Sequence, residues 1–322
     1  MFQIIISVGS FLLGLLLLLY GADSLVRGAS SIAKKAGLSA LFIGLTIVSF
    51  GTSLPELMVN VTASLRGSND IAIGNILGSN ISNILLILGI SASIYPLSVK
   101  KGTVSKEIPF SLLAVVALFF LVNDSLIDGD SIPILSRADG LVLLLFFIIF
   151  MYYTVGISRK SDAEGDHPVK SYPHYLAASM VLGGMVGLFV GGNLLVDGAI
   201  KLAQAFGLSE ALIGLTIVAV GTSLPELATS AVAAYRRQSD IAIGNIVGSN
   251  IFNIFWILGF SAIIKPLHFS LNLNIDLIVV MAATVLLVFF SFIGKRNVIQ
   301  RWNGTFLVSL YFVYVVYLVL RG

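Results

Sequence analysis

The sequence predicts an all-α membrane protein with ten transmembrane helices in two inverted five-helix repeats, with broken helices 2 and 7 at the core. Three observations lead to this fold class. Hydrophobic residues make up 57% of the 322 residues and charged residues only 11%, whereas soluble domains carry about 25% charged residues. Apolar stretches long enough to span a bilayer follow one another along the whole chain. Finally, the second half of the sequence repeats the first.

Ten apolar segments are expected to cross the membrane. The first has no positive residues before it and no clear small-residue cleavage site, so it is interpreted as a spanning helix and not as a signal peptide. Several segments are long enough to tilt or break. Their approximate limits are 2–28, 39–65, 70–95, 106–122, 138–157, 174–201, 209–235, 240–264, 274–293 and 303–320.

The sequence aligns on itself without a gap after a shift of 170 residues. Residues 44–90 and 214–260 share 30 identities in 47 positions, which is far more than shared hydrophobicity produces, so the two halves should have one fold. We expect a first five-helix repeat at 1–157, a short cytoplasmic linker at 158–173, and a second repeat at 174–322. Because each half has five spans, the second half must enter the membrane from the opposite side.

The distribution of Lys and Arg predicts a multi-pass protein of the plasma membrane with both termini extracellular. With the N-terminus outside, the inner loops carry 13 basic residues and the outer loops carry 5, while Arg27 lies within a span. Basic residues accumulate in the cytoplasmic loops of membrane proteins. This rule also accounts for the net charge of +3 without nucleic-acid binding, and no protein partner is evident. The absence of cysteine excludes disulfides and thiolate metal sites.

The hexapeptide GTSLPE occurs at 51–56 and again at 221–226, inside the second and seventh segments. Proline has no N–H and clashes with the carbonyl four residues earlier, so Pro55 and Pro225 should each break a helix. Irregular backbone at membrane depth survives only where it is buried in protein or lines a cavity. Such breaks at corresponding positions of two halves are typical of the binding site of a transporter.

Polar side chains accompany both breaks. Each GTSLPE copy places Thr, Ser and Glu on one helix face, and a second motif, GN-x-x-GSN, is followed by Asn four residues after its Ser. Ligation by oxygen alone suits hard cations such as calcium and sodium, and two carboxylates balance one divalent or two monovalent ions. The side chains that would meet are Thr52, Ser53, Glu56, Ser79 and Asn83 of the first half with Thr222, Ser223, Glu226, Ser249 and Asn253 of the second.

Other polar residues of these motifs leave alternatives open. Ser79 and Ser249 could bind a cation or bond back to their own helices. Asp70 and Asp240 are expected to cap the helices that begin beside them. Four asparagines could bind the cation or only bridge helices. These are Asn75, Asn80, Asn245 and Asn250.

On these motifs the chain resembles the calcium/cation antiporter superfamily, most closely its prokaryotic sodium/calcium exchanger branch. The paired GTSLPE and GN-x-x-GSN motifs look like the two alpha repeats of that family, and the resemblance covers nearly the whole chain. It implies a transporter and not an enzyme, which exchanges sodium for calcium by alternating access. Ca²⁺ and Na⁺ would bind in the core, with no prosthetic group. The implied ligands are the ten side chains above and the backbone carbonyls of Ser49 and Ala219.

One position departs from part of that family. Asn253 stands where some family members have Asp, notably potassium-dependent exchangers and some prokaryotic relatives. Asn at this position resembles the potassium-independent animal exchangers, which implies potassium-independent exchange and two site carboxylates instead of three. A proton-coupled calcium or cation exchanger remains an alternative, because Glu56 and Glu226 could carry protons. A cation channel fits less well, since two-fold inverted symmetry in a single chain suits alternating access better.

Overall fold

The computed structural model describes residues 2–124, 129, 133–158, 170–205, 219–293 and 296–321. Over these residues the protein is built almost entirely of helices, which confirms the predicted all-α membrane class. Eight of the described helices are long and apolar enough to cross a membrane, and one bent pair adds a ninth. The seventh predicted segment, 209–235, begins in a stretch outside the described residues, and most of the predicted linker also lies outside them.

The first half begins with a long helix and continues through short α-helical and π-helical pieces. Its helices are α1 (Phe2–Ala36), α2 (Ala40–Ile43), η1 (Gly44–Val48), α3 (Ser49–Thr52), α4 (Leu54–Arg66), α5 (Asn69–Ile81), η2 (Ser82–Ile87), α6 (Leu88–Ile94), η3 (Thr103–Glu107), α7 (Ile108–Val122) and α9 (Arg137–Ile157). The segments η1, η2 and η3 are π-helical.

The second half follows a similar order. Its helices are α10 (His174–Ala205), α12 (Ala219–Gly221), α13 (Leu224–Tyr235), α14 (Ser239–Ile251), η5 (Phe252–Leu258), α15 (Gly259–Ile264), η6 (Leu271–Leu273), α16 (Asn274–Phe290) and α17 (Arg301–Arg321). The segment η5 is π-helical and η6 is a 3₁₀-helix.

Two short antiparallel ribbons join the halves outside the helices. β1 (Leu97–Ser98), which follows α6, pairs with β4 (Val298–Ile299), which precedes α17. β3 (Leu267–His268), which follows α15, pairs with β2 (Ile134–Leu135), which precedes α9. The second ribbon therefore repeats the first with the two halves exchanged.

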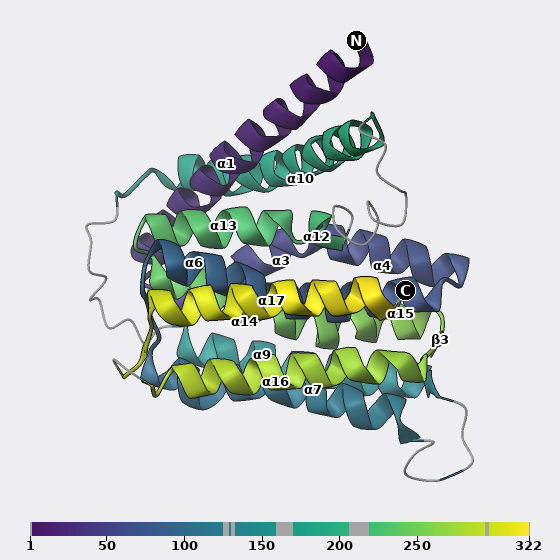
Figure 1. The fold of residues 1–322 in the computed structure, drawn as a ribbon. Coiled ribbons are helices and arrows are strands. Elements are labelled where there is room, and N and C mark those ends of the chain that lie inside the picture. The colour runs from purple at the N-terminus through teal and green to yellow at the C-terminus, as the bar shows by residue number, and fades with distance from the viewer. Residues whose placement is uncertain are drawn as a thin grey trace.

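The centre of the protein consists of the two helices that carry the GN-x-x-GSN motifs. In the most apolar 18-residue windows of Asn69–Ile94 and Ser239–Ile264, 78% and 83% of the residues are buried, against 22% to 39% in the other six candidate spans. Figure 1 shows α14 among the other helices and the pair α1 and α10 together along one side. The polar motifs thus occupy the part of the protein farthest from lipid.

Helices α1 and α10 approach each other closely through glycines. A Cβ added at Gly14 would lie 2.4 Å from the backbone nitrogen of Leu195, and one added at Gly191 would lie 2.7 Å from that of Leu18. Neither position has room for a side chain, because backbone cannot yield as a flexible side chain can. Close approach through small residues is a common way for helices to associate in membranes.

The expected capping role of Asp70 and Asp240 is wrong. Ser68 and Gln238 occupy the N-cap positions of α5 and α14, and neither cap has a side-chain hydrogen bond. Both aspartates lie within the first helical turn, where the partial positive charge of the helix N-terminus favours a carboxylate. Asp240 also pairs with Lys100, with 2.9 Å between Oδ2 and Nζ.

Candidate functional site

The first GTSLPE copy breaks its helix at Ser53, as predicted. Helix α3 ends at Thr52, α4 begins at Leu54, and the helical segments on either side are bent by 47°. Pro55 lies in the first turn of α4, where its missing N–H removes no helical hydrogen bond. The same turn contains Glu56, so the glutamate sits at the positive end of a helix dipole.

The second copy has the same local structure. Helix α12 ends at Gly221 and α13 begins at Leu224, with Pro225 and Glu226 in the first turn of α13. The turn residues between the two helices include Ser223, whose φ and ψ of −86° and 5° nearly equal the −85° and 8° of Ser53. The repeated sequence therefore produces a repeated backbone break.

The GN-x-x-GSN motifs lead into π-helical turns. Helix α5 passes into η2 at Ser82, and α14 passes into η5 at Phe252. Asn83 and Asn253 are each the second residue of the π-helical segment. π-Helical turns within α-helices are often found at functional sites, and here both copies occur at an asparagine that the sequence marks as a site residue.

Serines from each half donate to the glutamate of the other half. Ser53 Oγ donates to Glu226 Oε1 at 2.9 Å, and Ser223 Oγ donates to Glu56 Oε1 at 3.3 Å. All four side chains are buried. These crossed bonds bring the two distant GTSLPE copies together at one place.

A second pair of serines joins each glutamate within its own half. Ser79 Oγ donates to Glu56 Oε1 at 3.3 Å, and Ser249 Oγ donates to Glu226 Oε1 at 3.5 Å. The serines of the two motifs also contact one another, with 3.1 Å between Ser53 Oγ and Ser249 Oγ. Ser79 and Ser249 therefore point to the carboxylates, and bonding back to their own helices is not their role.

Among the buried oxygens that have no hydrogen-bond donor within the described part of the chain, four belong to the two glutamates and the two asparagines of the predicted site. They are Glu56 Oε2, Glu226 Oε2, Asn83 Oδ1 and Asn253 Oδ1. All four side chains are only 1% exposed, and each comes from a different helical segment. A buried acceptor left without a donor costs about 1–3 kcal/mol, so a cation that bound these oxygens would remove an unfavourable term.

The threonines of the two copies are held by asparagines of the opposite half. Thr52 Oγ1 donates to Asn245 Oδ1 at 3.0 Å, and Thr222 Oγ1 donates to Asn75 Oδ1 at 3.4 Å. Asn245 in turn donates to Ser230 Oγ at 3.0 Å. A threonine hydroxyl has one proton to donate and two lone pairs, so its oxygen keeps lone-pair capacity for a cation.

The family resemblance implies the backbone carbonyls of Ser49 and Ala219 as ligands, and the structure describes the surroundings of Ser49 more completely. The Ser49 carbonyl accepts from the Ser53 backbone N–H at 3.0 Å and from Thr52 Oγ1 at 3.3 Å. Ala219 is the first residue of α12, and the residues just before it lie outside the described part. The Ser49 carbonyl is thus at the break and next to the threonine of the site.

No basic side chain neutralises the two glutamates. The salt bridges among the described residues use Asp23, Asp240 and Asp276, and none includes Glu56 or Glu226. The two glutamates are also close enough to interact electrostatically. Two buried carboxylates without a basic partner must be neutralised by bound cations or by protons.

The asparagines Asn75, Asn80, Asn245 and Asn250 all bridge helices. Their hydrogen bonds run between α5 and α4, between α14 and α13, and between the two central helices. The sequence contained the signal, since all four lie inside the repeated GN-x-x-GSN motifs. It could not reveal which partner each amide would find.

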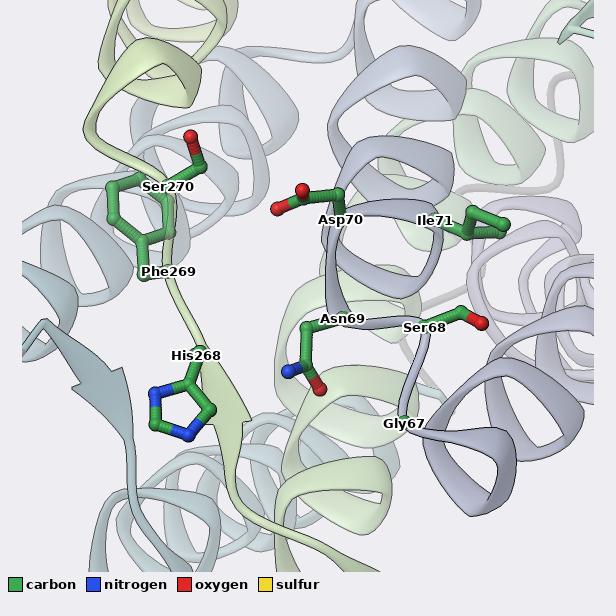
Figure 2. Close-up of a pocket in the computed structure, with 8 residues that line it drawn as sticks. All are labelled: Gly67, Ser68, Asn69, Asp70, Ile71, His268, Phe269 and Ser270. Atoms are coloured by element: carbon green, nitrogen blue, oxygen red, sulfur yellow. The ribbon is translucent and has the colours of Figure 1, made fainter.

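A separate pocket of about 470 Å³ lies where α5 begins. Figure 2 shows the Asp70 carboxylate directed toward Ser270 and Phe269, with Asn69 and His268 also at the pocket. The repeat places Ser270 where the other half has Lys100, 170 residues earlier. The pocket therefore has no counterpart of the Lys100–Asp240 ion pair, and none of the residues that line it belongs to the buried network.

Three comparisons identify similar proteins. The family model described as sodium/calcium exchanger protein matches residues 6–156 and 176–320. The chain is 33% identical over 347 residues to the sodium/calcium exchanger MaX1 of Methanosarcina acetivorans, covering 95% of this chain and 97% of MaX1. It is 39% identical over 273 residues to the Escherichia coli inner membrane protein YrbG, covering 81% of each. The solved structure of the sodium-calcium exchanger NCX_Mj, soaked with zero Na⁺ and Ca²⁺, matches with a TM-score of 0.82 and 37% identity, covering 98% of this chain and 99% of that one.

Proposed function

Because the chain belongs to the sodium/calcium exchanger protein family, we propose that it is a secondary active antiporter that exchanges Na⁺ for Ca²⁺ across a membrane. The observation that carries this function is the set of four buried oxygens without donors, on Glu56, Glu226, Asn83 and Asn253. They come from both halves and lie in a network without a basic residue. Oxygen ligands of this kind prefer to bind hard cations.

The same network supports a single site for both ions. The two glutamates supply a charge that one Ca²⁺ or two Na⁺ would neutralise, so the two kinds of ion compete for it. The hydroxyls add neutral oxygens that suit Na⁺. The full ligand set that we assign consists of the side chains of Thr52, Thr222, Ser53, Ser223, Glu56, Glu226, Ser79, Ser249, Asn83 and Asn253 with the backbone carbonyls of Ser49 and Ala219.

Alternating access follows from an inverted arrangement of the halves. We assign ten spans, with the first repeat at 1–157, a cytoplasmic linker at 158–173 and the second repeat at 174–322. Broken helices at corresponding positions support this assignment, as do the ribbons and serine–glutamate bonds that recur with the halves exchanged. In transporters with inverted repeats, the site near the midplane stays fixed while one part rocks against the other.

Potassium plays no part in the exchange that we propose. Potassium-dependent relatives carry an acid at the position of Asn253, and here the amide nitrogen of Asn253 donates to Asn80 Oδ1 at 2.9 Å. A carboxylate could not donate that bond, so the surroundings of residue 253 favour an amide. We place the protein in the plasma membrane with both termini outside, in agreement with the distribution of its basic residues.

Purified protein in liposomes tests the function directly. An outward sodium gradient should drive uptake of radioactive calcium, and Glu56→Gln or Glu226→Gln should abolish the uptake because each removes half of the site charge. Calcium flux that ignores sodium and follows a pH gradient would establish the proton-coupled alternative instead. Flux that is equally fast without any counter-ion gradient would contradict antiport and favour a channel.

A further inference from the structure

The site amides of Asn83 and Asn253 can serve a cation in only one of two orientations. An amide side chain ends in an oxygen that accepts and a nitrogen that donates two hydrogens. A rotation of the amide by half a turn would direct the positively polarised N–H₂ group to the cation and would exclude it. Something must therefore fix which end faces the ion.

The structure holds the nitrogen end of each amide on the opposite half of the protein. Asn83 Nδ2 donates to Asn250 Oδ1 at 2.9 Å, and Asn253 Nδ2 donates to Asn80 Oδ1 at 2.9 Å. These two bonds are equivalent under the 170-residue repeat, since residues 80 and 83 correspond to residues 250 and 253. In both amides the oxygen, which is the end without a donor, is left for the cation.

The amide of one acceptor, Asn80, is itself fixed. Asn80 Nδ2 donates to the backbone carbonyl of Asn250 at 3.3 Å, so its oxygen is the end available to Asn253. Asn80 is 0% exposed and Asn250 is 1% exposed, which keeps bulk water from replacing these bonds. In such surroundings the loss of one partner leaves a buried polar group unsatisfied.

We infer that Asn80 and Asn250 are positioning residues that orient the ligand amides of Asn253 and Asn83 toward the transported cation. They act through these amides and do not bind the ion. This inference rests on the proposed function, which identifies the transported ion. It adds that the two halves depend on each other to form the site. Each half fixes the amide ligand of the other, so neither half can assemble its share of the site alone.

A pair of substitutions at one position separates this role from packing. Asn80→Leu keeps the approximate size but removes the acceptor oxygen, whereas Asn80→Asp keeps an acceptor oxygen for Asn253. The half-saturating Ca²⁺ concentration of uptake should rise about 10- to 100-fold in the Leu variant, as for other groups that orient metal ligands. It should stay much closer to the wild-type value in the Asp variant. Equal values for the two variants would overturn the inference.

A double-mutant cycle tests the route of action. If Asn80 acts through Asn253, then Asn80→Leu should change Ca²⁺ half-saturation little once Asn253→Leu is present. Asn250→Leu and Asn83→Leu should behave in the same way. The control cycle combines Asn80→Leu with Thr52→Ala, two residues that have neither a mutual hydrogen bond nor a shared hydrogen-bond partner, and its effects should multiply. Multiplying effects in both crossed pairs would contradict the proposed role.

Measurements of melting temperature test this inference separately from the proposed exchange function. The rise in melting temperature on adding Ca²⁺ alone reports binding in purified protein without any gradient, and the melting temperature without ions reports folding. A variant that folds but loses the Ca²⁺-dependent rise supports the positioning role even if sodium is not the counter-ion. Wild-type protein without sodium-driven uptake would refute the proposed exchange and leave the binding comparison valid.

Discussion

The serines next to the glutamates show how single residues define the site. Each glutamate uses Oε1 to accept bonds from two serines, one from each half, and Oε2 receives no bond within the described residues. The hydroxyls therefore hold the carboxylates in place while one oxygen of each stays available. Hydrogen bonds to charged groups contribute about 1.5–3 kcal/mol, so these serines should affect ion binding more than other buried serines do.

Replacing Ser53 by alanine should weaken calcium binding. Ser53→Ala removes both a ligand oxygen and the donor to Glu226, and the half-saturating Ca²⁺ concentration of uptake should rise about tenfold, as a loss of 1.4 kcal/mol implies. The matched control is Ser64→Ala in α4, the helix that begins directly after Ser53. Ser64 is 0% exposed, and its hydroxyl makes no hydrogen bond in the described structure. Similar shifts in the two variants would argue against a specific role for Ser53.

At the level of secondary structure, the broken helices determine where the two glutamates of the site lie. The break at Ser53 directs the N-terminus of α4 at the core, so that Glu56 is in its first turn. The corresponding break does the same for Glu226 in α13. The π-helical segments η2 and η5 then shift the helical register at Asn83 and Asn253. Regular α-helices through these segments would place the same residues in a different register and move the side chains apart.

Proline makes the break persistent, and Pro55→Ala should weaken it. Alanine restores an N–H that can bond to the carbonyl of Gly51, so the 47° bend should decrease and Glu56 should move away from Ser223. The expected result is sodium-driven calcium uptake reduced severalfold, without a lower melting temperature, because alanine favours a helix far more than proline does. Pro225→Ala should have the same effects on calcium uptake and melting temperature.

Pro109 provides the control for that substitution. Like Pro55, it lies in the first turn of a helix, here α7. No hydrogen bond of the buried network includes its neighbours in that turn. Pro109→Ala should leave uptake unchanged. A comparable loss in Pro109→Ala would show that proline removal disturbs the protein in general and does not act through the bend.

At the scale of the whole molecule, the halves form one site together. Ser53 and Glu226 are 173 residues apart, and Asn83 and Asn250 are 167 apart. The crossed serine–glutamate bonds form one exchanged pair, and the bonds donated by the Asn83 and Asn253 amides form another. A site shared symmetrically by two inverted halves can open to either side by equivalent movements, which is the requirement for alternating access.

Cysteine labelling tests the inverted arrangement. The chain has no cysteine, so single substitutions report their own location. Lys101 and Leu271 are exposed and correspond under the 170-residue repeat. A membrane-impermeant maleimide should label Leu271→Cys in intact cells but Lys101→Cys only after the membrane is permeabilised. Labelling of both from one side would contradict inversion.

The sequence by itself determined the class of the protein, the positions of its breaks and the residue types of the proposed site. These features depend on local physics: apolar composition requires a membrane, proline at 55 and 225 cannot continue a helix, and residues four apart on a helix share a face. The gap-free repeat also indicated that two copies of the motif should have one structure.

Only the tertiary structure decided which groups meet. It assigned Ser53 to Glu226 instead of Glu56, turned the amides of Asn83 and Asn253 toward the opposite half, and placed Asp70 and Asp240 in the first turn instead of at the caps. Hydrogen bonds between residues more than 160 positions apart depend on how whole helices pack, and local sequence carries no record of that geometry. The ligand types were therefore readable in advance, whereas the orientation of each ligand required the folded chain.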